Sequence, residues 1–122
     1  MRYAVLCYNH EDTVFSWNQA EDDAVMARLA AVHDKVPPHR FGPSARLQPT
    51  STATTLHKTS EPPLVIDGPY AETKEQLLGF YIVDFDTLDE VLDWVRELGK
   101  ANPGGAYEIR PVRLFVPGSL TP

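Results

Sequence analysis

The stretch 79–85, GFYIVDF, is the most apolar segment of the chain, and a helical pattern follows it at once over 87–99, TLDEVLDWVRELG. Apart from Asp84, apolar residues occupy both faces of the first segment, which is typical of a strand covered on both sides. Thr87 and Glu90 have the spacing of a capping box, so the helix is predicted to begin near Thr87. It is expected to end at Gly99, after an apolar stripe made of Leu88, Val91, Leu92, Val95 and Leu98.

Three further elements flank this strand and helix. Residues Ala106–Arg110 alternate between apolar and charged side chains, which predicts a last main strand. Near the start, Arg2–Tyr8 is rich in aromatic and branched residues and is expected to form a central strand. Ala20–Lys35 is predicted to be a helix, with acidic residues in its first turn and apolar residues at helical spacing: Val25, Leu29, Val32 and Val36.

A β-hairpin is predicted between the two halves. Its strands are Thr52–Thr59, which is rich in β-branched residues, and Leu64–Asp67, with a turn at 61–63. We expect Leu56 and Ile66 to share a buried face, because a one-residue slip would place them on different faces. The opposite face would then carry Ala53, Thr55, His57, Val65 and Asp67.

The order strand, helix, hairpin, strand, helix, strand predicts a single α+β domain over residues 1–122. It fits a ferredoxin-like antiparallel sheet of the βαββαβ type with two helices on one face. The other face would carry too many apolar side chains to remain in water. We therefore expect a homodimer in which two sheets pack face to face.

Composition excludes several classes of protein. The chain has 122 residues, 17 acidic against 11 basic, and a net charge of -6, with no basic run. Nucleic acids and anionic membranes are therefore not expected partners, since both require clustered Lys and Arg. The single cysteine, Cys7, forms no intrachain disulfide, and the longest apolar run, Leu77–Val83, is too short to cross a membrane. A cytoplasmic location is expected.

Residues 67–77, DGPYAETKEQL, are the most specific motif of the sequence. Together with 79–82, GFYI, and 108–112, EIRPV, this motif resembles the DGPF-type proteins of the YCII-related family. The chain has Tyr70 where that family has Phe, and Leu78 where it has Gly. The resemblance implies a dimeric α/β-barrel built from ferredoxin-like subunits.

The resemblance also implies two classes of function. One YCII-like member is linked to removal of chloride from a chlorinated aromatic ring, and a His–Asp pair in a cleft has been proposed for YCII-like proteins. An enzyme doing acid/base chemistry on a small acidic or aromatic molecule is therefore expected, with no cofactor and no metal. Many DGPF-type genes lie beside sigma-factor genes, so a non-catalytic module that binds a ligand or regulatory partner is the alternative.

Asp67 and His57 are the candidate catalytic residues. The expected hairpin register places both on one face, in diagonal positions across the hairpin. An Asp beside a His orients the imidazole and increases its basicity, which suits proton transfer. Alternatively, Asp67 caps the turn at Gly68–Pro69 through backbone N–H groups, and His57 is a solvated strand residue.

The candidate substrate-binding residues are mostly ionic. Lys74 or Arg110 is expected to bind an anionic substrate group. Alternatively, these cations pair with Glu72 and Glu75 and hold the motif together. Thr55 and Tyr70 complete the candidate set.

The remaining reactive residues are assigned structural roles. His33, at the end of the first predicted helix, is expected to be a solvated capping residue. The run 10–12, HED, has metal-ligand side chains without metal-ligand spacing. Cys7 is expected in the core.

Overall fold

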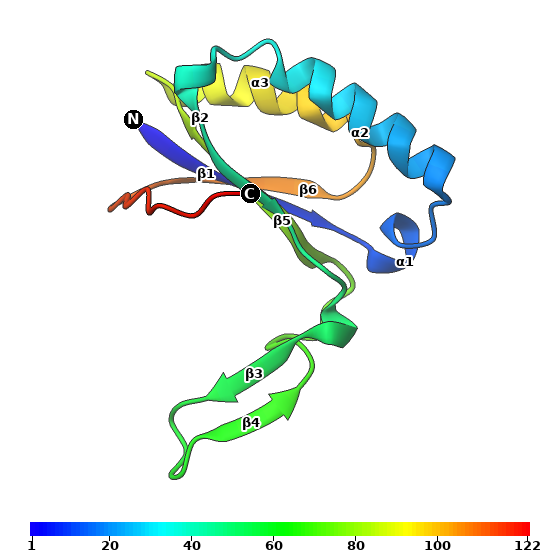
Figure 1. Cartoon of the computed structure of the whole chain (residues 1–122), viewed down its shortest axis with the longest axis vertical. Coiled ribbons are helices and arrows are strands. Elements are labelled where there is room, and N and C mark those ends of the chain that lie inside the picture. The colour runs from blue at the N-terminus through cyan, green and yellow to red at the C-terminus, as the bar shows by residue number, and fades with distance from the viewer.

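The computed structural model describes all residues from Met1 to Pro122, and its centre is a four-stranded antiparallel sheet (Figure 1). Strand β1 (Arg2–Asn9) lies between β5 (Gln76–Asp84) and β6 (Ala106–Pro111), while β2 (Phe41–Arg46) pairs with the outer side of β5. The order β2-β5-β1-β6 is that of a ferredoxin-like fold, which confirms the predicted fold class. The central position predicted for the first strand is also confirmed.

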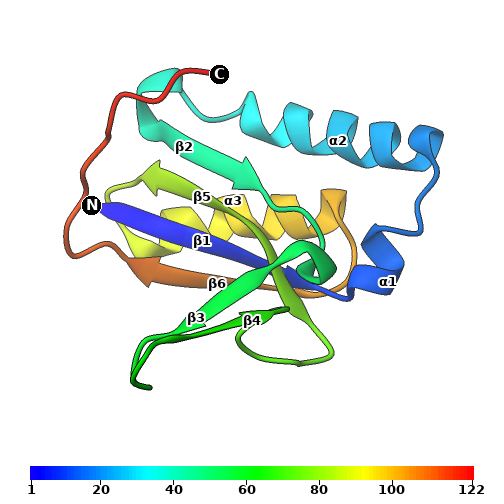
Figure 2. The same cartoon turned by 60° about the horizontal axis from the view of Figure 1, so that its bottom comes forward.

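Two long helices, α2 (Gln19–His33) and α3 (Leu88–Ala101), cover one face of the sheet (Figures 1 and 2). A short helix, α1 (Glu11–Val14), connects β1 to α2. Thr87 accepts a hydrogen bond from the Glu90 amide at 3.3 Å, as the capping pattern predicts. The predicted end at Gly99 is wrong, because the helix continues two residues further and buries Ala101. One glycine costs a helix only about 1 kcal/mol, so tertiary packing decides where the helix ends.

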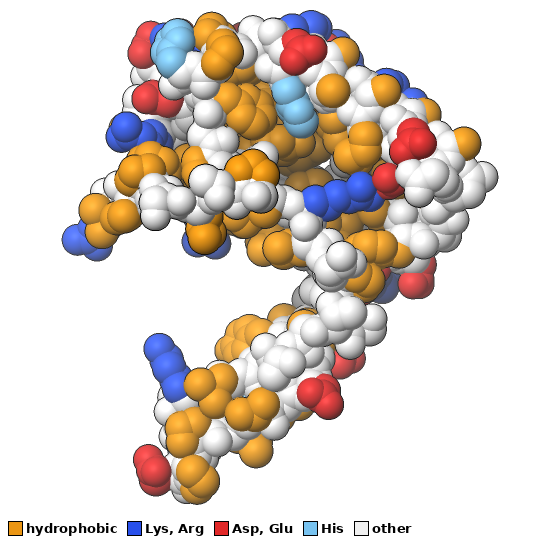
Figure 3. Space-filling view, in the orientation of Figure 1, with side chains coloured by type: hydrophobic (Ala, Val, Ile, Leu, Met, Phe, Trp, Pro, Cys, Tyr) orange, Lys and Arg blue, Asp and Glu red, His pale blue; other side chains and the backbone are white.

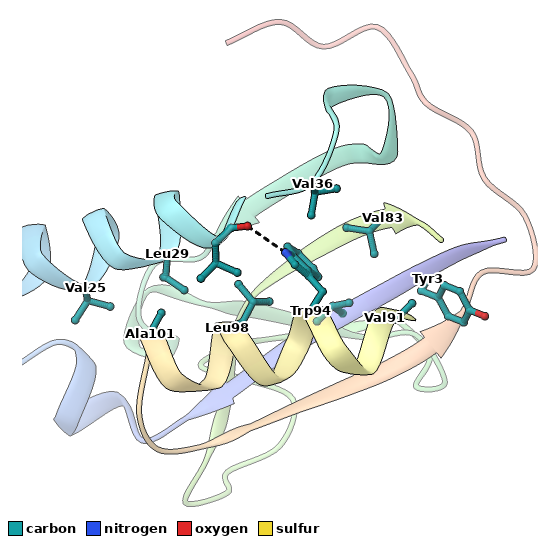
Figure 4. Packing of buried hydrophobic residues seen from close by; sticks show 11 residues of the cluster. Tyr3, Val25, Leu29, Val36, Val83, Val91, Trp94, Leu98 and Ala101 are labelled. Carbon is teal, nitrogen blue, oxygen red and sulfur yellow. Dashed lines mark hydrogen bonds between the residues drawn. The ribbon is translucent and has the colours of Figure 1, made fainter. Parts of the chain in front are cut away.

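The core lies between the helices and the sheet (Figure 4). Val5 and Val83, from adjacent strands, and Val91 and Leu98, from α3, are fully buried. All four apolar residues predicted for the first helix are buried there as well. The α3 stripe also includes Trp94, whose Nε1 donates a hydrogen bond to the Val32 carbonyl at 3.4 Å and so joins the two helices.

Strand β2 was not predicted from the sequence. Its residues, FGPSAR, include the Gly42–Pro43 pair, which argues against a strand. The strand tolerates them because it lies at the sheet edge and its register shifts between Phe41 and Ser44. A Cβ atom on Gly42 would lie 2.8 Å from the Ile82 carbonyl oxygen, so this close approach requires glycine.

The predicted hairpin exists as β3 (Thr54–His57) and β4 (Leu64–Asp67), but the expectation that it belongs to the main sheet is wrong. It forms a separate two-stranded sheet, and residues 54–67 are called the arm below. The arm extends away from the sheet on the side opposite the helices (Figures 1 and 2).

The register of the arm also differs from the expectation. Leu56 lies opposite Val65, and Thr55 lies opposite Ile66, so Leu56 and Ile66 are on different faces. The prediction assumed that one face of the hairpin is buried, but neither face is buried within the chain. Val65 is 63% exposed and Leu56 is 58% exposed.

The sheet face away from the helices also carries apolar residues. Leu6 lies opposite Phe80, and Ala4 lies opposite Ile82, all on the side away from the core residue Val5. These four residues are half-buried. The last eleven residues of the chain form no further strand.

None of the helices has the length and hydrophobicity needed to cross a membrane.

Candidate functional site

A polar cleft of about 640 Å³ lies between the motif, the start of α1 and the turn before the arm. None of its twelve lining residues is hydrophobic. Three segments that are distant in sequence contribute to it: residues 10–12, residues 50–51 and residues 67–76.

The cleft brings together three of the residues predicted for the site. Asp67, Glu72 and Lys74 all line it, and all three are exposed. Their charged groups form no ion pair within the chain. Glu75 is different, because its Oε1 lies 3.9 Å from the His10 Nε2. The interpretation in which the ionic residues of the motif pair with one another is therefore not what the structure shows.

His10 was not predicted as a site residue, although it lines the cleft beside the motif. Its backbone amide donates a hydrogen bond to Oδ1 of the buried Asn9 at 2.8 Å, which fixes the chain where β1 ends. The next residue, Glu11, accepts hydrogen bonds from the Thr50 amide and hydroxyl, both at 2.9 Å. Two walls of the cleft are thus joined directly. The sequence signal was the polar run that directly follows a central strand.

The expected pairing of Asp67 with His57 is not present in this register. Asp67 lies opposite Thr54, whereas His57 lies opposite Leu64, so the two candidates occupy different faces of the arm. The His57 ring instead packs near the ring of Tyr70, with centroids 6.0 Å apart. The catalytic roles of Asp67 and His57 remain predictions.

The other predicted binding residues lie outside the cleft. Thr55 donates a hydrogen bond from its hydroxyl to the Gly68 carbonyl at 2.7 Å and supports the turn of the motif. Tyr70 is 83% exposed. Arg110 lies on the uncovered sheet face, and its Nε donates to the Glu108 carboxylate at 3.0 Å. The expectation that Arg110 pairs with the motif carboxylates is therefore wrong.

A second, apolar cavity of about 240 Å³ lies between α2 and the helix-covered face of the sheet. His33 lines it, with Nε2 3.0 Å from the Tyr81 hydroxyl oxygen, so the prediction of a solvated capping histidine is wrong. Burial lowers the pKa of His33 and raises that of Tyr81 to about 12. Burial also raises the pKa of the Cys7 thiol, which lines the same cavity. No three His, Cys, Asp or Glu side chains are grouped so that they could hold a metal ion.

Sequence comparison shows which family this fold and motif represent. The profile of the YCII-related domain matches residues 1–116. The chain belongs to the YCII-related family. This YCII-related protein is 52% identical over 122 residues to an uncharacterized protein of Rhizobium meliloti (strain 1021), and the match covers 98% of both chains.

Structural comparison gives a similar fold. One solved structure with that fold is 5-chloro-2-hydroxyhydroquinone dehydrochlorinase (TftG) from Burkholderia phenoliruptrix AC1100, in complex with 2,5-dihydroxybenzoquinone. The TM-score is 0.55 at 15% sequence identity, and the match covers 93% of this chain and 94% of the dehydrochlorinase. At this identity the similarity establishes the fold alone.

Proposed function

We propose that this YCII-related protein is an enzyme that needs no cofactor and performs acid/base chemistry on a small acidic molecule in the polar cleft. The observation that carries the proposal is that Asp67, Lys74 and His10 line the same cleft. Carboxylate, ammonium and imidazole groups are sufficient for proton transfer and for binding an anion. The similar fold of the dehydrochlorinase, named for a small hydroxylated ring compound, supports a small-molecule substrate.

Each of the three residues has a distinct role in this proposal. Lys74 binds the anionic group of the substrate, because its ammonium group forms no ion pair within the chain. Asp67 accepts and returns a proton at the reacting carbon or oxygen. His10 replaces His57 as the imidazole of the site, and the Glu75 carboxylate lies beside it, with Oε1 3.9 Å from Nε2.

The first experiment is a thermal-shift screen of the purified protein against small carboxylic acids and phenols, because a ligand of the native state raises the melting temperature. Compounds that stabilise the protein are then tested for turnover. Lys74→Ala should weaken binding of a carboxylate at least tenfold, since it removes a charge-assisted contact. Lys58→Ala is the matched control, because Lys58 is an exposed lysine of the arm outside the cleft.

Asp67→Asn tests catalysis separately from binding. It should retain the melting temperature and the bound carboxylate but lose at least 99% of the turnover. Asp89→Asn, on the exposed first turn of α3, is the control and should leave carboxylate binding and turnover unchanged. The proposal would be contradicted if Lys74→Ala and Lys58→Ala lost equal carboxylate affinity. Full turnover in Asp67→Asn would contradict it as well.

We also infer that two copies of the chain form a homodimer. The arm leaves Leu56, Leu64, Val65 and Ile66 exposed, and Figure 3 shows hydrophobic side chains gathered along it. The arm lies on the same side as the uncovered sheet face, so one partner can contact both surfaces. Sedimentation equilibrium should give about twice the chain mass of 13.6 kDa.

A non-catalytic ligand-binding dimer is the second candidate function. The exposed position of Asp67, Glu72 and Lys74 favours it, because enzymes usually shield proton-transfer groups from water. In that case, the ligands found in the screen are recovered chemically unchanged, and Asp67→Asn alters only their affinity.

A further inference from the structure

The charges that line the polar cleft are not balanced. Four carboxylates line it, against the one ammonium group of Lys74. The Glu11 carboxylate is already engaged, because it accepts two hydrogen bonds from Thr50, both at 2.9 Å. The other three carboxylates form no ion pair within the chain: Asp12, Asp67 and Glu72. A simple anion at Lys74 would therefore lie in a field of excess negative charge, which opposes its binding.

Glu72 and Lys74 carry opposite charges on either side of Thr73. Both line the cleft and both are exposed, yet they form no ion pair with each other. Each charge is therefore available to a group of opposite sign on a ligand. A molecule that carries both a carboxylate and an ammonium group would bridge the two side chains, with its carboxylate at Lys74 and its ammonium group at Glu72.

A metal ion accounts less well for the excess of carboxylates. A divalent cation requires several oxygen ligands around one point. No three His, Cys, Asp or Glu side chains of the chain are grouped in that way. An ammonium group pairs with a single carboxylate, so dispersed carboxylates favour an organic cation over a metal ion.

The size and lining of the cleft indicate a small hydrophilic ligand. Its volume of about 640 Å³ lies within the ~300–1,000 Å³ that is usual for ligand sites. No hydrophobic residue lines it, so an aromatic ring or a long alkyl chain would bury little apolar surface there. The free energy of binding must therefore come from the charged and polar groups of the ligand.

We infer that the cleft binds small aliphatic amino acids as zwitterions, with the carboxylate at Nζ of Lys74 and the ammonium group at the Glu72 carboxylate. This inference rests on the proposed function, since it narrows the small acidic substrate to one that also carries an amine. A zwitterion has no net charge, so the excess of carboxylates does not repel it as a whole. Asp67 remains available for proton transfer.

Titration of the ¹⁵N-labelled full chain, followed by NMR, tests the inference, because it measures weak affinities and locates the residues that respond. The probes are glycine, 3-aminopropanoate and 4-aminobutanoate, which differ in the spacing of their two charges. Each is compared with the acid that lacks its amine (acetate, propanoate or butanoate) and with the amine that lacks its carboxylate (methylamine, ethylamine or propylamine).

Glu72→Gln is the test variant, because it removes the carboxylate that is expected to pair with the ammonium group. Asp89→Asn is the matched control, since it makes the same change from acid to amide on α3, outside the cleft. Lys74→Ala removes the expected partner of the ligand carboxylate.

At least one amino acid should bind about fivefold tighter than both its matched acid and its matched amine, a factor typical of an exposed ion pair. The amide shifts should be largest in residues 10–12 and 67–76. Glu72→Gln should weaken amino-acid binding about fivefold without weakening that of the acid. Lys74→Ala should weaken both, and Asp89→Asn should weaken neither.

The inference is overturned if no amino acid binds tighter than its matched acid and amine, or if Glu72→Gln keeps the wild-type affinity for amino acids. Acids that bind equally well with and without the amine, and still depend on Lys74, overturn this inference but leave the proposed function intact. If amino acids bind as expected but no compound bound in the cleft is turned over, the proposed reaction fails and this inference stands.

Discussion

Arg46 and Asp22 join the edge strand β2 to helix α2 through two hydrogen bonds. The Nη2 of Arg46 donates to Oδ1 of Asp22 at 2.5 Å, and its Nη1 donates to Oδ2 at 3.2 Å. The guanidinium group lowers the pKa of Asp22 below its ordinary value, mainly through this hydrogen bonding. The Asp22 carboxylate also lies in the first turn of α2, where the helix dipole favours a negative charge. One residue pair thus holds the edge of the sheet against the helix layer.

Arg46→Ala should therefore reduce the free energy of unfolding by about 1 kcal/mol, the upper end of the range for a partly exposed pair with two-point geometry. Urea denaturation at pH 7 and low salt measures this change. Arg96→Ala is the control, because the exposed Arg96 pairs only with Asp93, one turn away on the same helix. Equal destabilisation by the two substitutions would show that the Arg46–Asp22 pair has no special role.

Gly105→Ala should destabilise the fold strongly. Gly105 has a φ of +72°, and a Cβ atom there would lie 2.0 Å from the Tyr8 carbonyl oxygen. The left-handed conformation alone costs a non-glycine residue about 1–2 kcal/mol, and the backbone clash adds to it. We expect a loss of more than about 2 kcal/mol in urea denaturation.

Gly104→Ala is the matched control for that clash. Gly104 also has a positive φ, +89°, but its nearest potential contact is the Asn9 side chain at 3.6 Å. It should lose only the conformational cost of about 1–2 kcal/mol. If the two alanine variants are equally stable, the close approach of Gly105 to β1 is not required by the fold.

His33 should make the protein less stable as the pH falls. Its pKa in the folded state is lowered by burial, although the nearby Asp34 opposes this effect. Below about pH 6.5 the unfolded chain binds a proton that the folded chain does not, so the free energy of unfolding decreases from pH 6.5 down to the lowered pKa. His33→Gln should flatten the stability profile between pH 7.5 and 5.5. The exposed His39 serves as the control, since His39→Gln should leave the slope unchanged.

Local patterns were sufficient to predict the two long helices and three of the four strands of the main sheet, β1, β5 and β6. The apolar spacing of Val25, Leu29 and Val32 and the alternation around Tyr107 each follow from burial on one side of an element. Strand β2 could not be predicted, because its pairing depends on the distant strand β5 and not on its own FGPSAR sequence. A strand whose own residues lack the alternating pattern depends on tertiary context.

The candidate site was predictable only in part. The motif led to Asp67 and Lys74, which the structure places on the same cleft. The polar run after β1 was a sequence signal for His10, but its place on the cleft depends on how β1 ends beside the motif. The error with His57 had a different cause, since the predicted register required a buried hairpin face that the arm does not have.

Assembly should depend on both apolar surfaces that the single chain leaves uncovered. Phe80 lies opposite Leu6 on the uncovered sheet face, and Val65 is exposed on the arm. A lysine at either position places a charge where the partner is expected to pack, so Phe80→Lys and Val65→Lys should sediment at the mass of one chain. Both should keep the circular dichroism spectrum of the wild type, whereas Val5→Lys, in the fully buried core, should not fold.

Two results would contradict this prediction. A wild-type protein that sediments as one chain at micromolar concentration would show that no second copy covers the sheet. A Val65→Lys variant that remains fully dimeric would show that the arm lies outside the interface, even if Phe80→Lys dissociates. Lys58→Glu controls for charge, because Lys58 is an exposed residue of the arm that already carries an ionic group. Because that position already carries a charge, its substitution should leave the sedimenting mass unchanged.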